Sequence, residues 1–423
     1  MKREELARHF LNVRQQIVQS CQPLFVEDYV IQSMADVSPP KWHLAHTTWF
    51  FETFILLRLM KSYKLFDSSY NYRFNSYYQT ISQPYPRAER GLLSRPTTEV
   101  IYAYREYVNN HILLLIEQIP DNQLPTLKHL LNWGFQHEQQ HQELLLMDIK
   151  YNFSRDPDFP CYRASSITEK ATMLNTNRQM IEVAGGIVEI GYQGTDFCFD
   201  NELPRHKKFL SPYLIAPQLV TIGEYLEFID DRGYENPQWW LSDGWDWINQ
   251  QSIQAPLYWQ KIDNDWHIFT LNGLKPLNLA EPVSHVSYYE ADAYAKWHGC
   301  RLPTEEEWEH LVVSTDLDPQ QGNFLDNAMF HPQPAIDGNA PIQFFGDLWE
   351  WTASPYVPYP GYQSVTGALG EYNGKFMNNQ FILRGGCCVT PRSHIRASYR
   401  NFFQPEKRWQ FSGIRLAANF DGR

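Results

Sequence analysis

Histidines at helical spacing are the residues of this chain most suited to metal chemistry. His137 and His141 lie four residues apart in the run HEQQH, and residues i and i+4 lie on the same face of a helix. Their two imidazoles can therefore hold one ion. An earlier apolar segment carries His43 and His46 in the run HLAH, and either of them can supply a third ligand. The spacing alone does not choose between these two histidines.

The run HEQQH also matches the HExxH pattern of zinc peptidases. The extended pattern would place glycine at position 144 and histidine at position 147, where this chain has Leu144 and Met147. A following glutamate ligand is also missing, because residues 144–168 contain no glutamate. The match therefore does not extend beyond the run itself, and we disfavour a zinc peptidase.

The expected ligands also bear on the kind of metal. Three neutral imidazoles leave the ion its full positive charge and several open positions, which suits a ferrous ion that must also bind substrate and dioxygen. Zinc in a catalytic site usually keeps a tetrahedral set of ligands that includes one water. Charge alone does not decide between the two metals.

The histidine pairs lie in segments with helical periodicity. Apolar residues recur at helical spacing over residues 4–20, 41–60, 100–119 and 124–153. These amphipathic segments predict a four-helix bundle, a fold that builds metal sites in its core from side chains on facing helices. The connection over residues 61–96 is long and rich in Tyr, Asn, Ser and Arg, and long connections of this kind are often functional.

The rest of the chain has a different pattern. Residues 156–180 are polar and contain Pro157 and Pro160, which predicts a linker. Beyond it, short β-like runs alternate with clusters of Gly, Pro and Asn, and Thr304 and Glu307 have the spacing of a capping box before a helix. We therefore predict an α+β protein with a helical bundle at 1–155, a linker at 156–180 and a second domain at 181–423.

Composition and charge exclude several classes of protein. The 36 Lys and Arg residues against 48 Asp and Glu give a net charge of −12, which argues against a nucleic-acid-binding protein. The longest apolar stretch, residues 49–60, is interrupted by Glu52 and Arg58, so we expect no membrane segment. The cysteines form no CxxC pair and the N-terminus has no signal-peptide pattern. We expect a cytoplasmic protein in which Cys387 and Cys388 are free structural thiols.

Five motifs follow one another in the second half of the chain. They are PVSHVS at 282–287, RLPTEEEWE at 301–309, GDLWEWT at 346–352, RGG at 384–386 and GIRL at 413–416. This set resembles the formylglycine-generating-enzyme-like domain, which has a C-type-lectin-like fold. The first half, with its HxxxH pair, resembles a DinB-like four-helix bundle. Together the two halves resemble the nonheme iron sulfoxide synthases of ergothioneine biosynthesis, the EgtB-like hercynine oxygenase family.

The resemblance implies a specific reaction and a specific metal. The family joins the imidazole of hercynine to a cysteine-type thiol, using dioxygen and Fe(2+), and oxidises the sulfur to a sulfoxide. The family's three-histidine site falls on His46, His137 and His141. We therefore expect an enzyme whose substrates are hercynine, L-cysteine and dioxygen.

Two further motifs bear on the sulfur donor. Tyr77 and Tyr78 resemble the tyrosine pair of the family branch that uses free cysteine, and the run Asn401-Phe402-Phe403 also resembles that branch. The branch that uses γ-glutamylcysteine has Trp-Asp in this run, and its acidic group holds the glutamyl amine. The resemblance therefore favours free cysteine.

We assign roles to these residues as hypotheses. Either tyrosine can donate a proton or hydrogen bond to the reacting oxygen species. Arg87 and Arg90, three residues apart, are suited to clamp the carboxylate of cysteine. Aromatic and polar side chains can hold the trimethylammonium group of hercynine, and the expected set is Gln140, Asn401, Phe402 and Phe403.

Other functions stay open from the sequence. One alternative is a related oxygenase that couples γ-glutamylcysteine or a selenium donor to hercynine, or a relative specific for histidine. Another is a non-catalytic binding module that uses the lectin-like domain. For the tyrosines and phenylalanines, the simpler interpretation is packing, and for the two arginines it is a solvated turn.

Overall fold

The computed structural model describes residues 2–164, 179–335 and 341–420. The chain forms two compact units, each described by itself. The first comprises Met1–Tyr162 together with the short segment Thr366–Tyr372, and the second comprises Arg163–Val365 and Asn373–Arg423. Most of the linker predicted at 156–180 lies outside the described residues.

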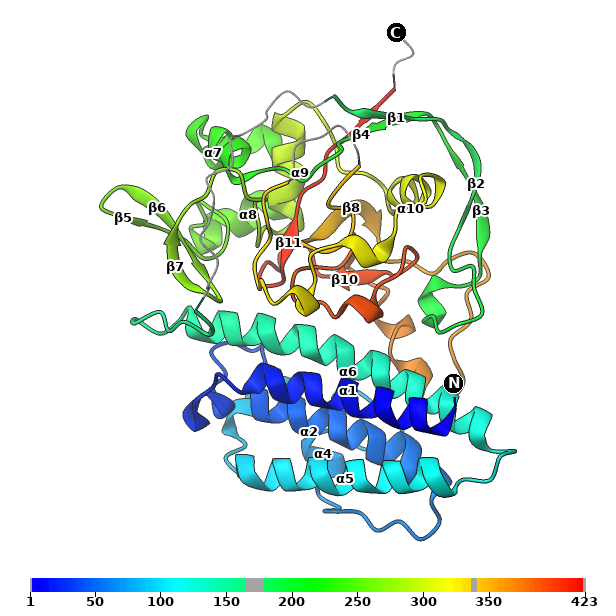
Figure 1. Cartoon of the computed structure of the whole chain (residues 1–423). Coiled ribbons are helices and arrows are strands. Elements are labelled where there is room, and N and C mark those ends of the chain that lie inside the picture. Colours follow the sequence, from blue (N-terminus) through cyan, green and yellow to red (C-terminus); the bar gives the residue numbers. More distant parts are fainter. Residues whose placement is uncertain (1, 165–178, 336–340, 421–423) are drawn as a thin grey trace. The chain divides into compact units, whose positions relative to one another are not determined.

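The first unit is built on four long helices that lie side by side (Figure 1). They are α1 (Arg3–Cys21), α2 (Pro40–Phe51), α5 (Thr98–Gln118) and α6 (Leu124–Phe153). Helix α2 contacts both α5 and α6, and α1 contacts α5 and α6. The predicted four-helix bundle is therefore confirmed. Short elements complete the unit: η1 (Val26–Val30), η2 (Glu52–Leu56), α3 (Leu57–Leu59), α4 (Tyr70–Arg73) and η3 (Arg87–Leu92).

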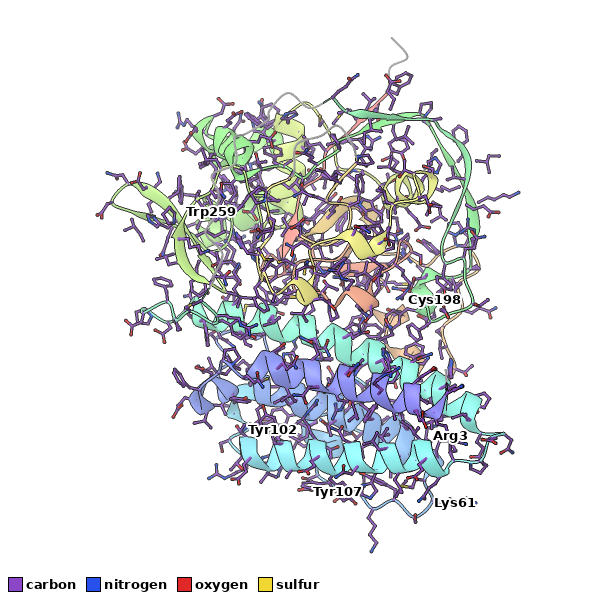
Figure 2. All side chains as sticks on the ribbon, viewed as in Figure 1. Arg3, Lys61, Tyr102, Tyr107, Cys198 and Trp259 are labelled. Atoms are coloured by element: carbon purple, nitrogen blue, oxygen red, sulfur yellow. The ribbon has the colours of Figure 1, made fainter. Side chains whose placement is uncertain are left out.

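Local sequence explains where these helices begin and end. Helix α2 starts with Pro40, whose fixed φ suits the first turn. Helix α5 starts after Thr97, whose hydroxyl accepts a hydrogen bond from the backbone of Val100. At the other end of α5 the guanidinium of Arg3 donates to the carbonyl oxygens of Ile116 and Ile119 (Figure 2). These carbonyls have no partner within the helix, so a cation there is favourable.

A buried ionic cluster joins the helices of the bundle. Glu138 of α6 accepts hydrogen bonds from Arg14 of α1 at 2.6 Å and from Arg105 of α5 at 3.0 Å. Both arginines also donate to the hydroxyls of Thr47 and Thr48 on α2. The Glu138 carboxylate is fully buried, and these two guanidinium groups supply its counter-charge. Burial lowers the pKa of Arg14 to about 10, with the positive charge of Arg105 as a further cause.

The second unit combines four small sheets with helices. Strand order is β1-β4-β12, β10-β9-β8-β11, β2-β3 and β5-β6-β7. The strands are β1 (Ile181–Val183), β2 (Gly186–Ile190), β3 (His206–Leu210), β4 (Tyr213–Ile215), β5 (Trp259–Ile262), β6 (Asp265–Thr270), β7 (Gly273–Pro276), β8 (Trp349–Pro355), β9 (Phe381–Arg384), β10 (Asn401–Phe403), β11 (Ser412–Gly413) and β12 (Ala417–Asn419). The main helices are α7 (Ile222–Asp230), α8 (Ser242–Gln251), α9 (Tyr288–Trp297) and α10 (Glu305–Ser314). Pairing is antiparallel except between β8 and β11, which run parallel.

Charged residues of the sequence motifs pair with one another inside this unit. The capping box predicted before α10 is present, because the Thr304 hydroxyl accepts from the backbone of Glu307 and the Glu307 carboxylate accepts from the backbone of Thr304. Arg384 of the RGG motif donates to Glu305 at 2.9 Å. Arg415 of the GIRL motif donates to Glu350 of the GDLWEWT motif at 2.7 Å. These motifs therefore hold the domain together from within.

None of the six cysteines, all of which lie among the described residues, is in a disulfide; Cys387 and Cys388 are buried, and Cys198, labelled in Figure 2, is half-buried. Among the helices that the structure describes, none has the length and apolar character needed to cross a bilayer.

Candidate metal centre

Three imidazoles converge in the core of the helical bundle. His46 lies on α2, and His137 and His141 lie one turn apart on α6. One nitrogen of each ring lies within 4.8 Å of the others, and the Nε2 atoms of His46 and His137 are 3.0 Å apart. The exposed fractions are 0%, 5% and 9% in chain order, so His46 is fully buried and the other two rings are nearly so. The structure thus brings together the three histidines expected to bind metal.

Close packing of α2 against α6 makes this meeting possible. Gly134 lies one turn before His137, and a Cβ atom added there would lie 2.5 Å from Cε1 of Phe51 on α2. Only a residue without a side chain leaves room for that ring. The helices can therefore approach closely enough for His46 to reach His137.

The chemistry of the three rings fits a divalent metal ion. Burial lowers the pKa of His137 to about 3 and holds the pKa of His46 and His141 well below the usual value, with neighbouring histidines as further causes for the last two. The rings are therefore neutral and keep a lone pair, which is the form that ligates metal. Two such nitrogens at 3.0 Å can both reach one ion at the usual metal–imidazole distance of about 2.1 Å.

Neighbouring groups fix the orientation of the rings. The Nδ1 atom of His46 donates to the carbonyl of Phe74 at 2.5 Å, which leaves Nε2 for a metal. The same ring stacks on Trp42 with a centroid distance of 4.5 Å and an interplanar angle of 11°. His137 stacks on Phe50 at 4.2 Å, and its Nδ1 is buried without a hydrogen-bond partner among the described residues.

His43 lies beside the centre and outside the triad. Its Nδ1 is 2.9 Å from Nδ1 of His141, and its Nε2 is 3.0 Å from a carboxylate oxygen of Asp148. Both ring nitrogens are therefore engaged away from the point where the other three rings meet. The geometry places His46, and not His43, in the cluster.

The predicted tyrosine pair lies against the aromatic side chains that support the histidines. Tyr78 is buried, and its hydroxyl is 3.2 Å from the hydroxyl of Tyr77. Its ring contacts Trp49 and Phe50. Trp49 stacks on His46 and Phe50 stacks on His137. Burial raises the pKa of both tyrosines, so both phenols stay protonated at neutral pH.

A segment distant in sequence covers this tyrosine pair. Residues 366–372 pack with the first unit, where the ring of Tyr372 stacks on Tyr77 at 5.8 Å. The Tyr372 hydroxyl accepts a hydrogen bond of 2.8 Å from Nε2 of Gln140 on α6. The neighbouring Glu371 accepts bonds from the backbone of Gln79 and from both the backbone and the hydroxyl of Thr80. Gln140 and the tyrosine pair therefore share one neighbourhood.

The two predicted arginines have different surroundings. Arg90 is buried and stacks over Trp42 at 3.4 Å. It donates to the hydroxyls of Ser38 and Ser76 at 2.8 and 3.1 Å, and its Nε has no partner among the described residues. Burial holds the pKa of Arg90 well below the usual value, and the nearby charge of Arg87 adds to this. Arg87 itself is exposed and donates to a backbone carbonyl.

Comparison with known proteins identifies the family. Residues 165–316 and 341–420 match the sulfatase-modifying factor enzyme 1-like domain, and residues 9–145 match the DinB superfamily. The hercynine oxygenase of Mycobacterium tuberculosis is 35% identical over 241 residues, which are 52% of this chain and 55% of that protein. The hercynine oxygenase of Mycolicibacterium smegmatis is 31% identical over 308 residues, which are 66% of this chain and 69% of that protein.

The chain belongs to the hercynine oxygenase family. This confirms the α+β fold class and the resemblance of both halves. Ergothioneine biosynthesis protein 1 of Schizosaccharomyces pombe is also similar, at 28% identity over 268 residues that cover 60% of this chain and 31% of that protein. The alignment thus spans about half of the length of the M. tuberculosis hercynine oxygenase and about a third of the yeast protein.

The remaining predicted site residues of this hercynine oxygenase family member lie in its second unit. Asn401, Phe402 and Phe403 form strand β10 and are half-buried. The ring of Phe402 stacks on Tyr356 at 4.1 Å, and Phe403 meets Trp409 edge-on at 5.5 Å. Their role in binding stays a prediction, and both rings have packing partners.

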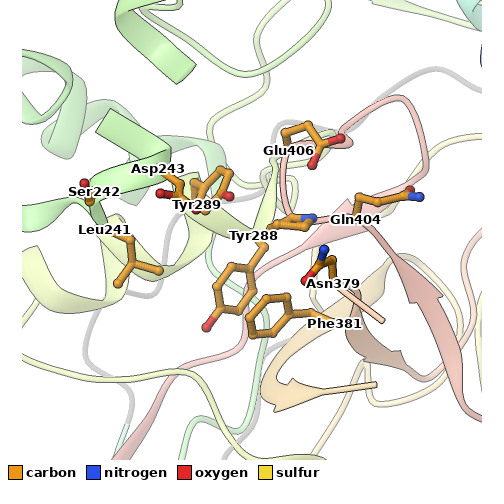
Figure 3. A pocket seen from close by; sticks show the side chains of 10 residues that line it. Leu241, Ser242, Asp243, Tyr288, Tyr289, Asn379, Phe381, Gln404 and Glu406 are labelled. Carbon is orange, nitrogen blue, oxygen red and sulfur yellow. The ribbon is translucent and has the colours of Figure 1, made fainter. Parts of the chain in front are cut away.

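The second unit also contains a pocket that does not involve these residues. Its volume is about 590 Å³, and Asp243 and Glu406 line it together with the rings of Tyr288, Tyr289 and Phe381 (Figure 3). None of the residues predicted for the metal or substrate site lines this pocket. We therefore place no step of the chemistry there.

Sequence reasoning missed two parts of the centre in this hercynine oxygenase family member. Asp148 lies seven residues after His141, two helical turns along the same face, and this spacing could have indicated a partner. Tyr372 carries no such signal, because more than two hundred residues separate it from the tyrosine pair. Only the folded chain brings that tyrosine to Gln140.

Proposed function

We propose that this chain is a nonheme iron(II) oxygenase of ergothioneine biosynthesis that joins hercynine to L-cysteine through a C–S bond and oxidises the sulfur to a sulfoxide. The observation that carries the proposal is the convergence of three neutral imidazoles in a member of the hercynine oxygenase family. A non-catalytic module can hold a structural metal ion, but structural sites are usually closed by four protein ligands, whereas three residues form this cluster.

His46, His137 and His141 would hold the iron. When bound, a ferrous ion with three imidazole ligands supplies open positions at which a thiolate and dioxygen can react. The protein keeps the ligands neutral through burial and directs the His46 ring through its bond to the Phe74 carbonyl. It also excludes bulk water from the ligand face, because His46 and His137 are at most 5% exposed.

Arg90 would bind the carboxylate of cysteine. A buried guanidinium whose hydrogen-bond partners are two neutral hydroxyls gains from an anionic partner. Its Nε–H, which has no partner among the described residues, can donate a hydrogen bond to that carboxylate. Arg87 would act from further out, through its charge.

The tyrosine pair would hold and deliver a proton. The phenol of Tyr78 is buried and protonated at neutral pH, and its hydroxyl lies at hydrogen-bond distance from that of Tyr77. A phenolic proton at this position can pass from one oxygen to the other and on to a reacting atom. This would steer the thiol toward coupling with hercynine and away from simple oxidation.

Hercynine would be held by polar and aromatic groups. Gln140 would present its amide from the metal helix, since it lies between the two ligands on α6. A quaternary ammonium group binds to aromatic rings, and each such cation–π contact contributes about 0.5–2 kcal/mol. Asn401, Phe402 and Phe403 are the residues that the sequence predicts for this contact.

The proposal is tested by a single-turnover assay with product analysis. The purified chain is loaded anaerobically with ferrous iron, mixed with hercynine and L-cysteine and exposed to air, while oxygen uptake and product mass are recorded. We expect hercynylcysteine sulfoxide from the wild type and none from His137→Ala. A γ-glutamyl or selenium adduct formed faster from the corresponding donor would overturn the assignment of cysteine, and turnover of the iron-free protein would overturn the metal chemistry.

A further inference from the structure

A buried hydrogen-bonded chain runs from a carboxylate to one ligand of the metal centre. Asp148, His43 and His141 lie in this order, with separations of 3.0 Å between Oδ2 of Asp148 and Nε2 of His43 and 2.9 Å between the Nδ1 atoms of the two histidines. Asp148 and His43 are each 2% exposed. The backbone N–H of Ser38 also donates to the same carboxylate oxygen at 2.8 Å.

The position of each proton in this series of hydrogen bonds follows from its two ends, the Asp148 carboxylate and the His141 ring. An ionised carboxylate can only accept, so Nε2 of His43 carries the proton that it donates to Asp148. A neutral imidazole carries one proton, so with that proton on Nε2 of His43 its Nδ1 is left as an acceptor. The contact at 2.9 Å then requires that Nδ1 of His141 donates. Nε2 of His141 is consequently free of a proton.

We propose that Asp148 and His43 are positioning residues that fix the tautomer and the ring angle of His141, so that its Nε2 faces the metal. The proposal rests on the metal centre proposed above. His43 thus has a role of its own in the centre without being a ligand. In the reverse arrangement, a proton on Nε2 of His141 would prevent that nitrogen from binding metal.

The three proposed ligands differ in the hydrogen-bond partner of their Nδ1 atoms. His46 donates to a neutral backbone carbonyl, and Nδ1 of His137 has no hydrogen-bond partner among the described residues. His141 is backed, through His43, by a carboxylate. Partners of this kind make a ligand nitrogen more basic and commonly raise the metal affinity about 10- to 100-fold. His141 should therefore depend most on its support.

Substitutions at His43 separate the hydrogen bond from the packing. His43→Phe keeps an aromatic ring but removes the acceptor for His141. His43→Asn keeps an oxygen near the place of Nδ1. The matched control is His111→Phe, because His111 is a half-buried histidine of α5 that bonds the carbonyl of Tyr107.

Two measurements are made on the full chain. Anaerobic titration with ferrous iron against a competing chelator gives the affinity, and long-range ¹H–¹⁵N spectra of the metal-free, [¹⁵N]histidine-labelled protein give the tautomer of His141. We expect His43→Phe to lose about tenfold to hundredfold in affinity and to show His141 with its proton on Nε2. His43→Asn should recover most of the affinity, and His111→Phe should match the wild type.

The outcomes distinguish this inference from the proposed function. If His137→Ala binds iron as well as the wild type, the metal centre itself is wrong. If His137→Ala loses iron while His43→Phe keeps both the affinity and the Nδ1–H tautomer of His141, the positioning role is wrong. Should His43→Phe fail to fold, Asp148→Asn replaces it, and an unchanged affinity and tautomer in that variant would equally overturn the role.

Discussion

Burial keeps the phenols of Tyr77 and Tyr78 protonated, and this is the basis of the chemical role that we propose for them. Both phenols have a raised pKa because burial disfavours the phenolate. A buried phenol that remains protonated at neutral pH is a proton donor that water cannot replace. Tyr78 is the more buried of the two and contacts the rings that support two of the histidines.

Tyr78→Phe should therefore alter the partition of the reaction more than its stability. The variant keeps the ring that packs between Trp49 and Phe54 and loses only the hydroxyl. We expect the ratio of hercynylcysteine sulfoxide to cysteine sulfinate to fall at least tenfold, as measured by mass spectrometry of the products. Tyr77→Phe is the matched variant, and unchanged ratios in both would exclude the pair as the proton source.

Arg90 and Arg87 provide a second contrast between neighbouring residues. Arg90→Leu removes the buried guanidinium, whose proposed hydrogen bond to the carboxylate of cysteine would contribute about 1.5–3 kcal/mol. We expect the KM for cysteine to rise about tenfold to hundredfold with little change in the KM for hercynine. Steady-state kinetics with each substrate varied in turn measure this difference. The exposed Arg87→Leu is the control, and equal effects of the two variants would contradict the assignment.

Helix α6 carries the proposed metal ligands and a residue of the buried ionic cluster on neighbouring faces. His137 and His141 face α2, while Glu138 binds Arg14 and Arg105 on the other helices. Glu138, next to the first ligand, therefore fixes how α6 is rotated about its axis and how far it is shifted along that axis. This explains why a residue of the HExxH run serves the fold here and not the chemistry of a zinc peptidase.

Glu138→Gln should destabilise the bundle strongly. It leaves two buried guanidinium groups without a counter-charge, a change that costs about 3–5 kcal/mol. Denaturant unfolding followed by circular dichroism measures the loss. The control is Asp121→Asn, which removes the exposed pair of Arg3 and Asp121, worth at most about 1 kcal/mol. Similar losses in the two variants would show that the buried cluster has no special role.

Local pattern explains how much of these elements the sequence could predict. The four helices follow from apolar periodicity, and the ligand pair on α6 follows from its i,i+4 spacing, because both signals are contained in one segment. The choice of His46 over His43 could not follow from spacing, since it depends on where α2 meets α6 and on the Asp148 carboxylate. The sequence could not predict the Arg14–Glu138–Arg105 cluster either, because its members come from three helices.

At the level of the whole molecule, a segment far from the histidines in the sequence packs beside the tyrosine pair of the candidate metal centre. Residues 366–372 lie between two segments of the second unit in the sequence but pack with the first unit. There Tyr372 contacts Tyr77 and Gln140. No local pattern predicts this packing, so the sequence placed Gln140 in the expected hercynine site but did not indicate its hydrogen bond to Tyr372. The two domain families themselves could be predicted, because their motifs are short, ordered and dense in charged and aromatic residues.

Iron binding by the intact chain decides whether the three histidines form one centre. Metal-free protein is titrated anaerobically with ferrous iron, and the electron paramagnetic resonance signal of its nitric oxide adduct is recorded. We predict one tightly bound iron per chain, with the signal lost in each of His46→Ala, His137→Ala and His141→Ala and retained in His111→Ala. Iron binding that survives the alanine substitutions, or a wild-type chain that binds no iron, would contradict the proposed centre.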